Sequence, residues 1–110
     1  MVHTCTVKED SSMILHIINA VAAPGQEKEA AAWVKQLAQY ANEKHGHSVE
    51  IMRSMDGRNG RYHWVHRIDS LAAWETTSAT WNADPQVQAM LDKGRHLFTN
   101  YETHRYEVVS

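Results

Sequence analysis

Hydrophobic and polar positions change their spacing several times along the chain, and each change marks an expected element. Residues 13–21 are mostly apolar at odd and at even positions alike, and they are rich in β-branched side chains. This pattern is typical of a strand buried on both faces. After Pro24 and Gly25, apolar residues recur at helical spacing over residues 30–41. This stretch predicts a long amphipathic helix that ends at Gly46.

The middle of the chain predicts a β-hairpin. Residues 49–55 alternate between apolar and polar, residues 56–60 are turn formers, and residues 61–68 alternate again. Successive side chains of a strand point to opposite faces. The second strand therefore has one face with Tyr62, Trp64, His66 and Ile68, and another with Arg61, His63, Val65 and Arg67.

The last third of the chain predicts two helical stretches and a closing strand. A capping side chain at Ser70 begins a helix that runs to about residue 81. A second cap at Asp84, followed by a proline in the first turn, begins another helical stretch that carries apolar residues as far as Phe98. Residues 101–109 are rich in Tyr, Thr and Val and favour a strand.

These elements follow the order βαββαβ, which predicts an α+β, ferredoxin-like fold. Right-handed crossovers then give a four-stranded antiparallel sheet in the order 4-1-3-2, with all helices on one face. Residues 13–110 form this domain, and residues 1–12 precede it as an N-terminal extension. The open face needs a cover, and a second copy of the chain is the simplest one, so we expect a homodimer through it. We expect a charged residue in place of Trp64 to dissociate or unfold that dimer.

Composition and charge restrict the classes of partner. The chain has 110 residues, which suits one domain, and 43% of them are hydrophobic, as in ordinary globular proteins. Its formal net charge is −2 and it has no basic run, so we expect no nucleic-acid partner. The first residues lack the order of a signal peptide, and no apolar stretch reaches the roughly 20 residues of a membrane helix, so we expect no membrane association. With Cys5 as its single cysteine, the chain suits a reducing cytoplasm, where we expect it to act.

Two segments resemble the dimeric α/β-barrel group, in which two ferredoxin-like protomers pack their sheets into a shared barrel. The first segment is Pro24-Gly25, which closes the first strand ahead of an acidic helix start. The second is residues 60–75, Gly-Arg-Tyr-His-Trp-Val-His-Arg-Ile-Asp-Ser-Leu-Ala-Ala-Trp-Glu. The group includes cofactor-independent antibiotic-biosynthesis monooxygenases, haem-degrading monooxygenases and stress-responsive barrel proteins. The resemblance spans residues 13–109 and implies a homodimer that acts on a small molecule.

The haem-degrading branch of that group uses three side chains, which can be compared with this sequence one by one. Asn19 resembles its asparagine on the first strand, and His96 is the histidine on the last helix. The late third-strand position, where that branch has a tryptophan, holds Ile68, and Trp64 lies earlier on the strand. Because the set is incomplete, we expect neither haem nor another cofactor, and no metal.

Eight histidines are the unusual feature of the composition. In the expected sheet, His16 on the first strand is flanked by His63 and His66 on the third strand and by His104 on the fourth. His63 and His66 point to opposite faces, and the matching apolar character of their strands pairs His66 with His16. We expect these two residues to act as proton-transfer groups in a barrel cavity. The alternative is that the histidines fill a semi-polar dimer core without a ligand.

The tryptophans and the end of the first helix suggest further roles. Trp33 and Trp74 lie beside Ala and Leu on helical faces, so we expect them in the core. Trp81, just before the helix break, suits a lid over a cleft. His45 and His47 flank the terminal glycine, and we interpret them as a solvated helix end.

The remaining candidates define the expected function. Arg61 and Arg67 suit either a bidentate grip on a carboxylate or ion pairs across the dimer. The candidate ligand contacts are Asn19, Arg61, His63, Trp64, Arg67, Trp81 and His104. We expect a dimeric small-molecule-binding barrel that acts as a cofactor-independent monooxygenase or isomerase. The alternative is a non-catalytic binding or stress-response protein whose barrel is filled, and a cavity of roughly 300 Å³ or more would favour the first.

Overall fold

The computed structural model describes residues 13–56 and 60–109. The elements in chain order are β1 (Ile14–Ala22), α2 (Glu27–Lys44), β2 (Val49–Arg53), β3 (Arg61–Ile68), α3 (Leu71–Ala83), α4 (Pro85–Gly94), a single 3₁₀ turn η1 (Arg95–Leu97) and β4 (Phe98–Glu107). The expected N-terminal extension and Cys5 lie outside the described residues. The order of strands and helices is the predicted βαββαβ.

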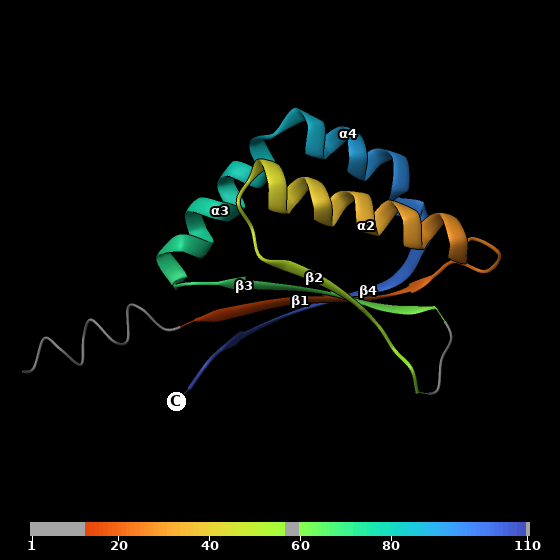
Figure 1. The fold of residues 1–110 in the computed structure, drawn as a ribbon, viewed down its shortest axis with the longest axis horizontal. Helices are drawn as coiled ribbons and strands as arrows, with labels where there is room; N and C mark the ends of the chain where they lie inside the picture. Colours follow the sequence, from red (N-terminus) through yellow and green to blue (C-terminus); the bar gives the residue numbers. More distant parts are fainter. Residues whose placement is uncertain (1–12, 57–59, 110) are drawn as a thin grey trace, which may run out of the picture.

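The strands form one antiparallel sheet in the order β2-β3-β1-β4, which confirms the predicted topology. Figure 1 shows α2, α3 and α4 together on one side of this sheet, while its other side is left open. The fold is therefore α+β and ferredoxin-like. The two central strands, β1 and β3, pair along their whole lengths, from Ile14 opposite Ile68 to Val21 opposite Arg61.

Several predicted boundaries hold and one is wrong. Ser70 caps α3 by accepting a hydrogen bond from the backbone of Ala73, and Asp84 caps α4 in the same way through Gln86. Phe98, expected at the end of a helix, is instead the first residue of β4. It pairs with Ala22 at the end of β1, and this ladder extends the strand three residues earlier than the sequence pattern indicates.

The register divides the sheet residues between its two sides. His16, Ile18 and Ala20 of β1 lie opposite His66, Trp64 and Tyr62 of β3, and all of these side chains face the helices. Leu15, Ile17 and Val21 of β1, with Arg61, His63, Val65 and Arg67 of β3, have the other parity and lie on the open face. Trp64 thus lies under the helices and not on the open face. The expectation that a charge at this position would disrupt a dimer interface is therefore wrong in its placement of Trp64.

A bulge in β4 places two aromatic side chains on the same side. The register of β1 with β4 shifts between Asn19 and Val21, and Asn100 on the partner strand has a positive φ of 55°. Because the extra residue reverses the alternation, Phe98 and Tyr101 both contact the space beneath the helices.

The helix α2 forms the main core against this sheet. Its buried face consists of Ala30, Val34, Leu37, Ala38 and Ala41. Beside it, Trp33 donates a hydrogen bond of 2.8 Å from Nε1 to the carbonyl of Met90 in α4. Gly94 at the end of α4 makes room for the same ring, because a Cβ there would lie 2.0 Å from Trp33. The helices are thereby fixed at a height that leaves space above the sheet.

Candidate functional site

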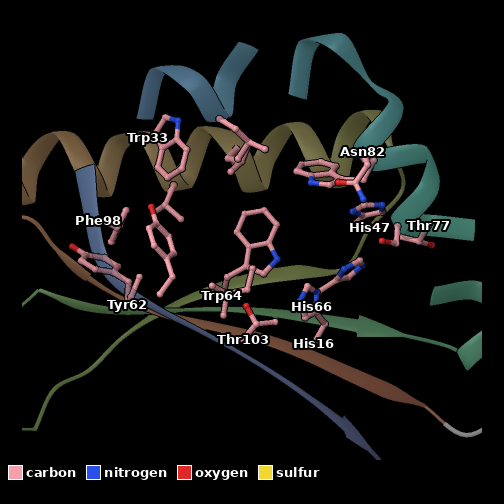
Figure 2. A pocket seen from close by; sticks show the side chains of 18 of the residues that line it. His16, Trp33, His47, Tyr62, Trp64, His66, Thr77, Asn82, Phe98 and Thr103 are labelled. Atoms are coloured by element: carbon pink, nitrogen blue, oxygen red, sulfur yellow. The ribbon is translucent and has the colours of Figure 1, made fainter. Parts of the chain in front are cut away.

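A cavity of about 400 Å³ lies between the sheet and the helices (Figure 2). Its floor comes from β1, β3 and β4, and its roof from α2, α3 and α4. The sequence predicts a cavity inside a barrel formed by two sheets. The structure places this one on the other side of the sheet, within a single chain.

One end of the cavity is aromatic and apolar. Trp33, Tyr62 and Phe98 gather there, and Trp64 separates this end from the other in Figure 2. The ring centroids of Tyr62 and Phe98 lie 5.6 Å apart, edge to face. All four tryptophans of the sequence line the cavity. Trp33 also packs against the core, as expected, whereas Trp74, which was expected there too, lies on a helix without buried residues and belongs to the cavity wall only. Flat aromatic walls favour a flat, apolar ligand.

Three histidines gather at the opposite end (Figure 2). His16 and His66 are direct partners across β1 and β3, and the side chain of His66 is almost fully buried. His47, from the loop between α2 and β2, stacks on His66 with ring centroids 4.4 Å apart and an angle of 27° between the rings. The structure therefore brings together the predicted pair His16 and His66 and adds a third imidazole.

Burial keeps these imidazoles uncharged. The pKa of His66 is lowered from 6.5 to about 4, chiefly by burial and also by repulsion from His47 and His16. Burial likewise lowers the pKa of His16, with a further contribution from Arg105, and the pKa of His47, with a further contribution from His45. Neutral His66 offers one donor nitrogen and one acceptor nitrogen at pH 7.

Asp84 ties the break between α3 and α4 to the end of α2. Its carboxylate accepts hydrogen bonds of 2.7 Å from the Tyr40 hydroxyl, 2.7 Å from His45 Nε2 and 2.9 Å from the Gln86 backbone. The bonds from Tyr40 and His45 lower the pKa of Asp84 to about 2. His45 was expected to be solvated, but only 8% of its side chain is exposed, because the ring packs against Tyr40 and Trp81.

The helix α3 covers the histidine end of the cavity. Trp74 meets His16 edge to face with ring centroids 4.6 Å apart, and Trp81 lies 5.5 Å from His47. Thr77 and Asn82 add polar groups to the same wall (Figure 2). No residue of α3 is buried, but Trp81 packs against the core cluster formed by Ala38, Ala41 and Val49. Trp81 lines the cavity, and its role as a lid stays a prediction.

The other predicted ligand contacts lie on the open face. His63 donates a hydrogen bond to Asn19 Oδ1, and Arg67 bonds Glu50 of the same chain at 3.3 Å. His104 lies on β4 beside Glu102, with 3.8 Å between His104 Nε2 and Glu102 Oε1. Arg61 borders a smaller hollow of about 230 Å³ together with Asn19. None of these five residues reaches the main cavity, because their strand parity directs them away from the helices.

His47 is the site residue that the sequence analysis missed. It lies in a loop, where no periodicity indicates the direction of a side chain, and it was interpreted as part of a solvated helix end. The signal available was its position: two residues before β2, whose first residue Val49 pairs with His66. A residue this close in sequence to the partner of His66 can place its side chain against the His66 ring.

Neither a metal centre nor a membrane span is found in residues 13–56 and 60–109. No group of three His, Cys, Asp or Glu side chains in these ranges has a geometry that could hold a metal ion. No helix there is long and apolar enough to cross a membrane.

Comparison with known proteins gives the fold. No family model and no curated protein matches the sequence. Among solved structures, a candidate antibiotic biosynthesis monooxygenase from Deinococcus radiodurans is 18% identical, with a TM-score of 0.69 over 88% of this chain and 93% of that chain. A NIPSNAP family protein of unknown function from Agrobacterium tumefaciens is 19% identical, with a TM-score of 0.74 over 89% of each chain. An uncharacterised NIPSNAP-like protein from Burkholderia xenovorans is 14% identical, with a TM-score of 0.76 over 91% of this chain and 88% of that chain. The chain shares the ferredoxin-like fold of these proteins, as the resemblance in the sequence implies.

Proposed function

We propose that the protein binds a flat, mostly apolar small molecule in the cavity beneath its helices and that His66, with His16, transfers a proton on it. The observation that carries this proposal is the convergence of uncharged imidazoles at one end of a cavity whose other walls are aromatic. The reaction is that of a cofactor-independent monooxygenase or isomerase, since both begin by removing a proton from the substrate.

The size of the cavity supports a ligand. Small-molecule sites typically enclose about 300 to 1,000 Å³, and this cavity encloses about 400 Å³. A protein that filled its interior with its own side chains would not leave this volume next to four tryptophans. The alternative of a non-catalytic protein with a filled interior is therefore less well supported than a ligand-binding one.

The state of His66 supports proton transfer. A general base needs an unprotonated nitrogen at the working pH, and burial keeps His66 in that state at neutrality. A pKa of about 4 also makes His66 a weak base, so proton removal requires that the ligand's developing charge be stabilised by a neighbouring group. His16 lies directly opposite on β1 and can hydrogen-bond the oxygen of a ligand while His66 receives the proton. The shared fold with a candidate antibiotic biosynthesis monooxygenase favours oxygenation, in which molecular oxygen would be the second substrate.

The open face of the sheet supports a homodimer. Leu15, Ile17 and Val21 share this face by strand parity, and Figure 1 shows none of the described helices over that side of the sheet. An apolar sheet face of this kind is stabilised by a second copy packing against it. In this proposal the dimer acts in the cytoplasm, as the single cysteine suggests, and each protomer holds its own cavity.

The test uses 2-tetralone, a flat bicyclic ketone with acidic C–H groups. Proton exchange between these groups and D₂O, followed by NMR, measures proton removal without assuming the later reaction. We expect the wild-type protein to accelerate the exchange and His66→Asn to reduce the acceleration by about 100-fold. His96→Asn serves as the matched control, because His96 is exposed and lies outside the cavity. Binding without faster exchange would favour the non-catalytic alternative, and no binding would contradict the proposal.

A further inference from the structure

The histidine end of the cavity contains basic groups without a matching acid. His16, His47 and His66 converge there. Among the described residues that line the cavity there is no Asp, Glu, Lys or Arg. The neighbouring groups that perturb the pKa values of the three imidazoles are themselves basic, namely His45 and Arg105. A ligand in this end therefore meets an uncharged but protonatable surface.

His45, the fourth histidine of this region, differs from the other three because its imidazole has a carboxylate partner. His45 lies next to His47, with ring centroids 5.3 Å apart, and it pairs with the Asp84 carboxylate at 2.7 Å. The Tyr40 hydroxyl and the Gln86 backbone N–H donate to the same carboxylate. The described hydrogen bonds include none from a ring nitrogen of His47 or His66 to a protein carboxylate. The position that Asp84 fills for His45 is thus open on the cavity side of His47 and His66.

We propose that this position takes the carboxylate of an aromatic organic acid, and that the histidine cluster gains one proton when the acid binds. The inference rests on the proposed ligand-binding cavity and specifies the chemical class of its occupant. His47 is assigned as the residue that takes up this proton and contacts the carboxylate, while His66 remains the unprotonated group of the proposed function. The aromatic remainder of the acid would extend past Trp64 towards Tyr62 and Phe98.

Charge balance restricts the ligand to a single negative charge. Two charged imidazoles with ring centroids 4.4 Å apart would repel each other, so the stacked pair of His47 and His66 takes up one proton at most. Arg105 adds to this repulsion at His16. One carboxylate compensates one proton, while a phosphate monoester would need a second positive group that the cavity walls lack. Lowered pKa values in the free protein mean that the proton must come from the solvent on binding.

The test compares two probes of the same shape, 2-naphthoate and its neutral counterpart 2-naphthamide. Isothermal titration at pH 7 in two buffers with different ionisation enthalpies measures the protons taken up on binding. We expect close to one proton per 2-naphthoate and none per 2-naphthamide. We also expect the affinity for 2-naphthoate to fall about tenfold for each pH unit above 7, with the affinity for 2-naphthamide unchanged.

Variants separate this proposal from simple partition of a neutral acid into an apolar cavity. We expect His47→Asn and His47→Gln to bind 2-naphthoate at least tenfold more weakly, while 2-naphthamide binding reports that the cavity is intact. His96→Asn should bind both probes like the wild type. Unchanged 2-naphthoate binding in the His47 variants, or binding without proton uptake, would overturn this inference alone. Failure of both probes to bind the wild type would contradict the cavity as a ligand site and thus the proposed function.

Discussion

Acidification from pH 7 to pH 5 should destabilise the protein through His66. In the unfolded chain this imidazole titrates near 6.5, whereas in the folded protein its pKa is about 4, because burial and the neighbouring His47 and His16 oppose its charge. Between these two values the unfolded state binds more protons. The stability contributed by neutral His66 is therefore complete above about pH 6.5 and is lost as the pH falls towards 4.

The two pKa values set the size of the effect. One pKa unit corresponds to about 1.4 kcal/mol, so a difference of 6.5 − 4 allows a loss of up to about 3 kcal/mol. At pH 5 the loss reaches about 2 kcal/mol. That is a large fraction of the roughly 5 to 15 kcal/mol that stabilises a typical domain.

Urea unfolding followed by circular dichroism at pH 7, 6 and 5 measures this dependence. The free energy of unfolding is plotted against pH for the wild type, for His66→Asn and for the exposed control His96→Asn, and the slopes are compared. A loss of packing that is the same at every pH lowers the free energy of unfolding but leaves its slope unchanged. We expect the slope of His66→Asn to be much shallower than that of the other two proteins. Equal slopes in all three would show that His66 is not held neutral by its surroundings, and the reasoning about the histidine end would fail.

Three further predictions concern the roof and the open face. Gly94→Ala places a Cβ 2.0 Å from the ring of Trp33, so we expect a loss of roughly 1 to 3 kcal/mol in urea unfolding, and an unchanged stability would contradict the close approach. Asp84→Asn removes the charged acceptor of the Tyr40 and His45 hydrogen bonds, so the melting temperature at pH 7 should fall, and the difference from wild type should shrink below pH 4 as Asp84 titrates in the wild type. Ile17→Lys puts a charge on the open face, so sedimentation of a dimeric wild type should give way to a 12.6 kDa monomer, and a wild type that is itself monomeric at micromolar concentration would contradict the dimer.

The fold could be predicted from the sequence because each element has a clear local pattern. The alternation in residues 61–68 fixed which side chains share a face, and it correctly paired His66 with His16 once β1 and β3 were expected as neighbours. The N-caps at Ser70 and Asp84 could also be predicted, because a short polar side chain directly before an apolar run is typical of a helix start. The start of β4 was not, because the bulge at Asn100 interrupts the alternation.

The site was only partly predictable, for reasons of packing. Parity separated His63 from His66, but it could not tell which side of the sheet holds a cavity, because that depends on how far the helices lie above the sheet. That height depends on contacts such as Trp33 against Gly94, which connect distant parts of the chain. His47 was missed because a loop side chain has no periodicity from which its direction could be predicted.

The central claim, that the cavity beneath the helices is the ligand site, is tested most directly by blocking it from the roof. Thr77 of α3 lines the cavity, while its neighbour Thr76 is exposed and does not. Thr77→Trp and Thr76→Trp therefore make the same substitution on the same helix, inside and outside the site. Titration calorimetry with 2-tetralone should show at least tenfold weaker binding to Thr77→Trp and wild-type binding to Thr76→Trp. Equal binding to both variants would place the ligand elsewhere and contradict the account.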